Sequence, residues 1–248
     1  MQLALSGRSL GVAHPIEEDI RIAAITGYPW LVVDQEKMES FLEQREFTIR
    51  DLKRLFLRTQ PAAVDALYLP DSAPKHISEA ERICKDARRV GAPVVVARIE
   101  KPDERIVELA DVAEQWSSVL ALAPSRDPAG VTFGDLRHLI FAANHPALGL
   151  YVDLVALWRT GDKPRAEDAE RTVLLAVSDV DEEGLPVLPG TGTVPLPQML
   201  APLYEGGYDS VAVLAMEGRD VPREPEAFAG AGLRALSDVL REVGWVVE

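Results

Sequence analysis

Short, almost continuously apolar runs alternate with longer amphipathic stretches from one end of the chain to the other. Runs of this kind are typical of strands that are buried on both faces of a parallel sheet. The predicted strands are 2–6, 29–34, 63–69, 93–99, 118–123, 147–153, 172–178 and 210–215. A helical period predicts helices at 15–26, 48–59, 76–90, 103–116, 132–143, 195–205 and 226–242. The connection 157–171 is polar and only weakly helical.

Boundary residues agree with this division of the chain. Thr48 is placed to begin a helix whose apolar positions recur at helical spacing. Gly27, Gly91 and Gly207 each follow a predicted helix and precede a strand, where a left-handed C-cap is required. We therefore expect each of these glycines to have a positive φ.

Eight strands alternate with helices within 248 residues, and no linker interrupts them. This pattern predicts an α/β protein with a single (β/α)8 TIM barrel domain spanning residues 1–248. A doubly wound open sheet is the alternative, but such a sheet usually carries a glycine-rich phosphate turn after its first strand. The sequence SGRSLG at residues 6–11 lacks the spacing of that turn.

The amino-acid composition excludes several classes of function. The chain has 26 Lys and Arg against 40 Asp and Glu, for a net charge of −14. Such a charge opposes phosphate-backbone binding and attachment to anionic membranes, so we expect no nucleic-acid or membrane partner. No apolar run approaches the roughly 20 residues that span a bilayer, and the first residues lack a signal peptide's basic leader. We expect a cytoplasmic protein. Because Cys84 is the one cysteine, an internal disulfide framework is excluded. We interpret Cys84 as a buried residue that packs within a helix.

In a barrel of this kind, functional groups lie at the carboxyl ends of the strands and in the loops that follow them. Converging carboxylates and arginines in one mouth could bind a polar, hydroxylated small molecule, although each could instead cap a helix or pair with a neighbour. The groups predicted there are Arg8, Asp34, Asp71, Arg98, Glu100, Ser125, Arg126, Asp127, Asp153, Ser178, Asp179, Asp181, Glu217 and Arg219.

Three segments carry a family resemblance: GVAHPIEEDIRIAAITGYPWLVVD, NHPALGLYVDLVALWRTGD, and the stretch from TVLLAVSDV through LPGTG to EGGYDSVAVLAM. They resemble, in order, segments of the xylose-isomerase-like barrels, a family that includes sugar-phosphate isomerases and epimerases, hydroxypyruvate isomerases and endonuclease IV. The resemblance covers nearly the whole chain and implies the same barrel fold.

The resemblance also implies a divalent-metal site with ligands from strands 5 to 8. The matching positions are Ala123, Asp153, Ala156, Ala176 and Ala215. Alanine offers no donor atom, and a divalent ion needs several oxygen or nitrogen ligands. We therefore expect no metal and no other cofactor. A two-residue shift of strand 8 would turn Glu217 inward in place of Ala215 but would leave strands 5 and 7 without ligands. The histidines at 14, 76, 138 and 145 are interpreted as surface or packing residues.

The remaining carboxylates and cations supply the candidate site residues. Proton transfer next to a carbonyl requires a base and a group that stabilises the enediolate. The candidate acids and bases are Asp153, Asp179, Glu217 and Glu100, and the candidate ligand-binding cations are Arg98 and Arg126. Trp158 and Arg159 could wall the pocket or pack the following loop. Gly190 and Gly192 permit a tight loop over the mouth.

Three functional hypotheses remain. The favoured one is a divergent isomerase- or epimerase-like barrel that lacks the metal site and binds a small polar or hydroxylated molecule, sugar-like ones included, without metal-dependent catalysis. The alternative is a metal-independent isomerase or epimerase of a small sugar or hydroxy-carbonyl compound that uses strand-end carboxylates. A third hypothesis, an active isomerase with a shifted strand register, predicts a bound divalent ion. A homodimer is left open as the only protein partnership.

Overall fold

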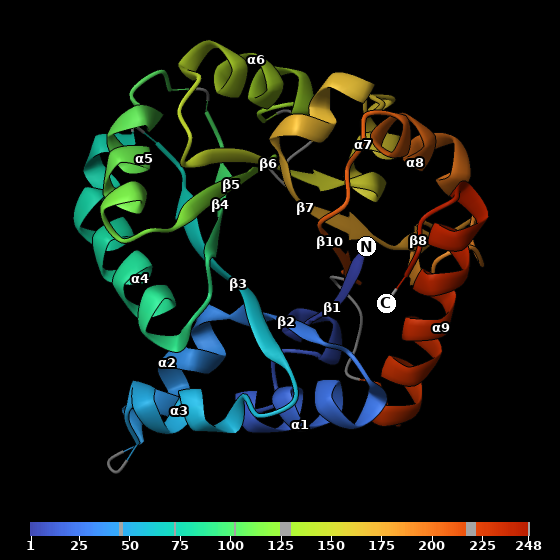
Figure 1. Cartoon of the computed structure of the whole chain (residues 1–248), viewed down its shortest axis with the longest axis horizontal. Helices are drawn as coiled ribbons and strands as arrows, with labels where there is room; N and C mark the ends of the chain where they lie inside the picture. The colour runs from blue at the N-terminus through green and yellow to red at the C-terminus, as the bar shows by residue number, and fades with distance from the viewer. Residues whose placement is uncertain (45–46, 72, 102, 125–129, 217–221, 248) are drawn as a thin grey trace.

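A closed barrel of eight parallel strands forms the centre of the molecule (Figure 1). The computed structural model describes residues 1–44, 47–71, 73–101, 103–124, 130–216 and 222–247. The barrel order is β1-β10-β7-β6-β5-β4-β3-β2, which confirms the predicted (β/α)8 fold class. The strands are β1 (Gln2–Ser6), β2 (Trp30–Asp34), β3 (Gln60–Leu69), β4 (Val94–Ile99), β5 (Val119–Ala123), β6 (Leu148–Asp153), β7 (Thr172–Val177) and β10 (Val211–Leu214).

Helices surround this barrel in a ring (Figure 1). They are α1 (Ile16–Thr26), α2 (Gln35–Glu43), α3 (Ile49–Leu55), α4 (Ile77–Val90), α5 (Ile106–Gln115), α6 (Phe133–Ala143), α7 (Leu154–Thr160), α8 (Leu196–Glu205) and α9 (Pro225–Val243). Short 3-10 helices are η1 (Gly7–Leu10), η2 (Ala73–His76) and η3 (Ala166–Arg171). The described part of the chain contains no helix that is long and apolar enough to cross a membrane.

The structure differs from the predicted elements in three places. Helix α2 was not predicted; it begins directly after β2, where Asp34 Oδ1 accepts hydrogen bonds from the backbone N–H groups of Glu36 and Lys37. The predicted helix 48–59 ends at Leu55, because β3 already begins at Gln60. The connection 157–171 contains the end of α7 and η3, and an additional hairpin, β8 (Asp179–Val180) with β9 (Pro186–Val187), follows β7.

The predicted glycine caps are confirmed. Gly27 and Gly91 end α1 and α4 with φ of +92° and +104°, in the left-handed region. Gly207 has φ of +81° before β10. These positive angles let the chain reverse at the end of each helix and enter the next strand without the strain that a Cβ atom would cause.

Mainly alanine and valine side chains fill the inside of the barrel. Successive strand residues face opposite sides, and the inward set forms a buried cluster separate from the larger core between the strands and the helices. Its members include Ala4, Val32, Ala63, Val96, Ala121, Tyr151, Ala176 and Val213. The next inward residue along each strand lies in the mouth of the barrel, so the same alternation decides which side chains line the mouth.

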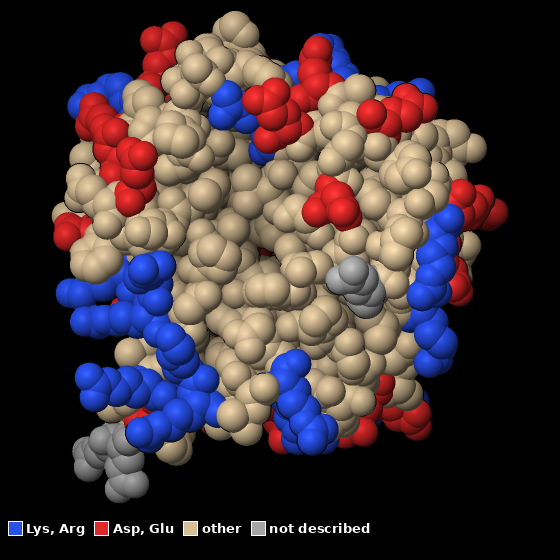
Figure 2. Space-filling view, viewed as in Figure 1, with Lys and Arg blue, Asp and Glu red and all other residues tan. Residues whose placement is uncertain are grey.

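The negative net charge is distributed unevenly. Figure 2 shows Lys and Arg gathered over α3 and α4, where Lys53, Arg54, Arg88 and Arg89 lie near the carboxyl ends of the two helices. Those helix ends precede the first residues of β3 and β4. The cationic area therefore lies at the amino-terminal end of the barrel, opposite the mouth.

Candidate functional site

The mouth of the barrel is polar on one side and apolar on the other. Strands β2, β3 and β4 place Asp34, Asp65 and Arg98 there, each two residues beyond an inward valine or alanine. On the other side the inward residues are Ala123 on β5, Asp153 on β6, Ala176 on β7 and Ala215 directly after β10. The described part of the mouth thus has a group of charges at β1–β4 and a single carboxylate, Asp153, on the opposite side.

Two arginines and two aspartates form a buried ion-pair group at β1–β4. Arg8 Nε lies 2.7 Å from Asp34 Oδ2 and 3.2 Å from Asp65 Oδ2. Arg98 Nη2 lies 3.5 Å from the same Asp65 oxygen. The side chains of Asp34 and Asp65 are only 3% and 7% exposed. The charges balance, which a buried group requires because an unpaired ion in a protein interior costs several kcal/mol.

Tyr151 supports this group from inside the barrel. The guanidinium carbon of Arg98 lies 5.7 Å from the centre of the Tyr151 ring, an arrangement in which the ring face attracts the cation. Tyr151 itself belongs to the buried interior cluster. The ring therefore holds the Arg98 head at the floor of the mouth, where a small ligand could contact it.

Sequence reasoning missed Asp65 and nominated Asp71 for strand 3. In the structure Asp71 lies beyond β3 and contacts Lys75 and His76 instead of the mouth. The pairing of β3 with β4 shifts between Asp65 and Leu67, so Ala66 is an extra, bulged residue. The signal that could have identified Asp65 is its spacing of two from Ala63, which faces the interior.

Four of the five positions that the family resemblance assigns to metal ligands hold alanine. Ala123, Ala176 and Ala215 all belong to the interior cluster and are at most 8% exposed. Ala156 is half-buried on α7. Asp153 is the only carboxylate among the five positions. This donor set does not fit a divalent ion, which needs several oxygen or nitrogen ligands.

Asp153 lies at the carboxyl end of β6, half-buried, with Ala176 as its Cα partner on β7. Its Oδ1 accepts a hydrogen bond of 3.0 Å from the backbone N–H of Ala156 and so caps α7. The other carboxylate oxygen, Oδ2, has no hydrogen-bond partner among the described residues. The hydrogen bond to Oδ1 fixes the orientation of the carboxylate. Oδ2 remains available to accept a proton or a hydrogen bond from a ligand.

Asp179 instead holds a loop together. Its Oδ1 accepts the backbone N–H groups of Val180 and Val194, both at 2.9 Å, and its Oδ2 accepts those of Gly190 and Gly192 at 3.1 and 2.8 Å. A carboxylate has about four acceptor sites, so this one is saturated. We therefore interpret Asp179 as the anchor of the loop over residues 190–194, in place of the acid or base role that the sequence suggested.

Comparison with known proteins identifies the relatives of this barrel. The sequence model of the xylose isomerase-like TIM barrels matches residues 43–239. The chain belongs to that family. Among curated protein sequences, none matches it. Of the solved structures, the IOLI protein with a bound zinc atom has a TM-score of 0.87 and 19% identity, with 99% of this chain and 100% of that one covered.

Two further solved structures are also similar over their whole length. A xylose isomerase domain protein from Alicyclobacillus acidocaldarius has a TM-score of 0.75 and 21% identity, with 97% of this chain and 99% of that one covered. D-psicose 3-epimerase from Clostridium cellulolyticum H10, solved with D-tagatose, has a TM-score of 0.77 and 13% identity, with coverage of 97% and 99%. At such identities the likeness establishes the fold.

The other predicted site residues of this xylose isomerase-like barrel are dispersed. Glu100 follows β4 and hydrogen-bonds Tyr68; partial burial, followed by the charge of Glu100, raises the pKa of the Tyr68 hydroxyl. Trp158 on α7 is 37% exposed. Arg159 donates from Nη2 to the carbonyl oxygen of Gly184, 2.9 Å away in the β8–β9 turn, so it packs the loop. Glu217 and Arg126 lie outside the described residues.

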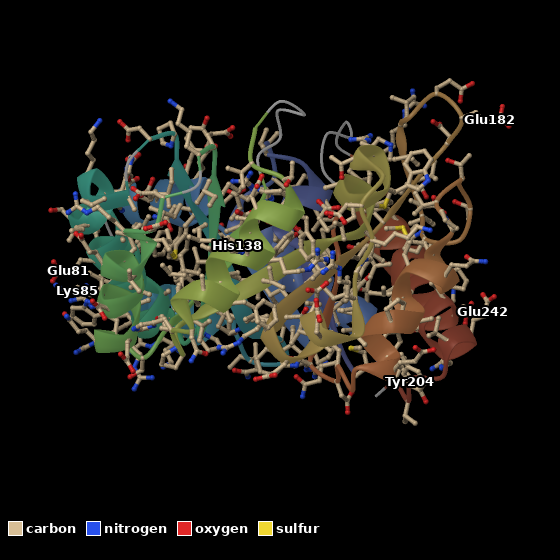
Figure 3. The ribbon with its side chains drawn as sticks, turned by 90° about the horizontal axis from the view of Figure 1, so that it is seen from above. Glu81, Lys85, His138, Glu182, Tyr204 and Glu242 are labelled. Carbon is tan, nitrogen blue, oxygen red and sulfur yellow. The ribbon has the colours of Figure 1, made fainter. Side chains whose placement is uncertain are left out.

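The histidines stay away from the interior of the barrel. Figure 3 shows His138 on α6, where it is exposed. In the described part of the chain, a single His/Cys/Asp/Glu group has ligand atoms within 4.8 Å of one another: Asp111, Glu114 and His145. His145 Nδ1 accepts the N–H of Ala147, so in the neutral ring Nε2 carries the proton and faces Asp111 at 3.2 Å. That arrangement opposes metal ligation by Nε2.

Proposed function

We propose that this protein is a divergent member of the isomerase and epimerase barrels that binds a small hydroxylated molecule in its mouth without metal-dependent catalysis. The observation that carries the proposal is the asymmetry of the mouth. Four balanced charges, those of Arg8, Asp34, Asp65 and Arg98, lie at β1–β4, whereas β5 and β7 offer alanine where the family resemblance places ligands.

The mixture of donors and acceptors in the group favours a hydroxylated ligand. The group contains two guanidinium donors and two carboxylate acceptors, and hydroxyl groups can hydrogen-bond to both types. A sugar-like polyol is therefore the preferred class. The name of one structural neighbour, D-psicose 3-epimerase solved with D-tagatose, shows that a barrel of this shape can act on such compounds.

Two measurements on the purified chain test the proposal. Elemental mass spectrometry after chelator-free purification should find no stoichiometric divalent metal. Thermal denaturation with D-tagatose and related polyols should show a saturable rise in Tm, since a ligand that binds only the folded state stabilises it. Arg98→Met should abolish that rise, and Arg165→Met, a change at an exposed arginine paired with Glu167, should retain it. Stoichiometric zinc or manganese would overturn the metal-free site.

One observation favours metal-independent isomerisation as a second candidate. Ala123 on β5 separates Arg98 on β4, its Cα partner, from the inward end of β6 that bears Asp153. A hydroxy-carbonyl compound above the alanine could lose its α-proton to the Asp153 carboxylate while Arg98 stabilises the enediolate oxygen. The same carboxylic acid would return the proton to the neighbouring carbon, while the proton of the substrate's own hydroxyl group passes to the enediolate oxygen, so that the carbonyl and hydroxyl groups exchange places.

Solvent-deuterium incorporation tests this second candidate directly. Incubation of hydroxy-carbonyl compounds with the protein in D2O should place deuterium on the carbon next to the carbonyl, as measured by mass spectrometry. Asp153→Asn should stop the exchange, because the amide cannot accept the proton. If deuterium exchange persists in Asp153→Asn, Asp153 is not the base. If the unaltered protein shows no exchange, the isomerase proposal is wrong and only the ligand-binding proposal remains.

A further inference from the structure

One face of the molecule carries two areas of opposite charge side by side. Figure 2 shows Lys and Arg over α3 and α4, and Asp and Glu over the neighbouring α5. This face is the amino-terminal end of the barrel, because the carboxyl ends of the three helices precede β3, β4 and β5. It therefore lies opposite the mouth and its proposed ligand.

The cationic area contains charges that no described residue balances. Arg54 and Arg89 each pair with an aspartate of their own helix. Lys53 and Arg88 are exposed, and neither forms an ion pair within the described residues. Lys53 reaches the end of α4 that bears Arg88, since a Cβ atom on Gly91, the residue that ends α4, would lie 3.9 Å from Lys53 Nζ. Two helices thus contribute unpaired cations to one area.

The end of α5 carries acids where its backbone favours cations. The side chains of Asp111 and Glu114 are 64% and 60% exposed, and the last turn of α5 contains no basic residue. Charges of the favoured sign at a helix end contribute about 0.3–1 kcal/mol, so these acids oppose the helix dipole. The neutral ring of His145 donates a hydrogen bond to Asp111 but supplies no charge. Cations from a partner would offset this cost.

Apolar side chains lie among these charges. Trp116, directly after α5, is half-buried, and Lys85 Nζ on α4 lies 5.8 Å from the centre of its ring. This pair therefore lies between the cationic and the acidic area. Leu55 and Leu57, at and just after the end of α3, are 39% and 83% exposed. Protein interfaces combine such apolar groups with a charged rim, and Trp is enriched near their centres.

A partner for this face needs charges of both signs. A membrane or a nucleic acid would attract Lys53 and Arg88 but would repel Asp111 and Glu114. A second copy of this chain supplies both signs. Under a two-fold axis between α4 and α5, the cations of one copy face the acids of the other, and the same contact occurs twice.

From these observations we propose that two copies of this chain form a symmetric dimer through the carboxyl ends of α3, α4 and α5. Lys53 and Arg88 of each copy contact Asp111 and Glu114 of the other, and the two Trp116 rings lie near the two-fold axis. Exposed ion pairs contribute about 1 kcal/mol or less each, so the dimer is weak and sensitive to salt. The interface is independent of the ligand proposed for the mouth.

Analytical ultracentrifugation of the full chain over a range of protein concentrations tests the proposal. At low salt the average mass should rise reversibly toward that of a dimer. Salt at about 1 M, where charges are screened beyond about 3 Å, should weaken the association by about tenfold or more. A chain that stays monomeric up to about 1 mM, equivalent to an association of only about 4 kcal/mol, would overturn the proposal and leave this face to a different partner.

Charge-reversal variants assign the dimer to this face. Arg88→Glu and Asp111→Arg should each weaken it by about 100-fold, because each change occurs twice in a symmetric interface and about 1.4 kcal/mol is a factor of ten. Arg241→Glu reverses an exposed arginine on α9, across the barrel (Figure 1), and should leave the dimer unchanged.

Mixing the two weakened variants provides the sharpest control. The Arg88→Glu chain presents acids at both positions and the Asp111→Arg chain presents cations at both, so an equal mixture should form a dimer again. This recovery also shows that both variants are folded. A dimer that survives both reversals, or a mixture that stays monomeric although circular dichroism shows both variants folded, would refute this interface.

Discussion

The loop after β7 offers the sharpest test of the structure, because one carboxylate holds it. Asp179 accepts four backbone N–H groups, and its own exposed fraction is 1%. Asp179→Ala removes all four bonds. The N–H groups of Val180 and Val194 are then left buried, at about 1–3 kcal/mol each, whereas those of Gly190 and Gly192 are reachable by water and cost less. The expected loss of unfolding free energy is about 4 kcal/mol.

Asp179→Asn provides a graded comparison. The amide keeps one acceptor oxygen and turns an NH2 group toward the other two N–H donors, so two bonds remain and two are lost. We expect it to lose about half as much unfolding free energy as Asp179→Ala, about 2 kcal/mol. Gly192→Ala should disturb the same loop, since its Cβ atom would lie 2.2 Å from the carbonyl oxygen of Val180.

Urea denaturation followed by tryptophan fluorescence measures the loss, and limited proteolysis with mass spectrometry measures how often the loop around residues 184–194 opens. Local release of the loop would accelerate cleavage there even if the rest of the barrel stays folded. If Asp179→Ala lies within 1 kcal/mol of the unaltered protein and the loop is cut no faster, the anchoring role is wrong. Asp179 would then return to the candidate acids and bases.

Three further outcomes are expected. Asp65→Asn removes the negative charge that Arg8 and Arg98 share, so urea denaturation should show a loss of about 3 kcal/mol in the free energy of unfolding. An unchanged denaturation midpoint would contradict the buried ion-pair group. Burial raises the pKa of the Asp19 carboxyl to about 7, although the nearby Lys37 opposes the shift. The folded state therefore holds the carboxyl proton more tightly than the unfolded state does, so the free energy of unfolding should fall as pH rises from about 4 to 7. Asp19→Asn should remove this part of the pH dependence. Burial also raises the pKa of Cys84 to about 12, so a disulfide reagent should label it only as fast as the protein unfolds; rapid labelling of the folded protein would contradict its packing.

The strands were the most predictable part of this protein. Each strand of the barrel was identified to within three residues at either end, because burial on both faces makes its residues continuously apolar in the sequence itself. The positions of Ala123, Ala176 and Ala215 were inferred from the family resemblance, and the structure places all three in the interior cluster. The glycine caps were predictable for a similar reason, since the need for a positive φ is a property of one residue.

The partners of the polar side chains were decided by the tertiary structure. Arg8 lies in η1, directly after β1, and β1 and β3 lie on either side of β2, so the fold brings Arg8 to Asp65 on β3. Strand β3 also bulges directly after Asp65. Asp179 is saturated by N–H groups as far as fifteen residues along the chain, which only the path of the loop brings back. The spacing of apolar residues indicates which face of a helix or strand is buried, and this is a local property of the sequence. The partner of a hydrogen bond or ion pair depends instead on the path of the chain between helices and strands. That path cannot be derived from the residue pattern.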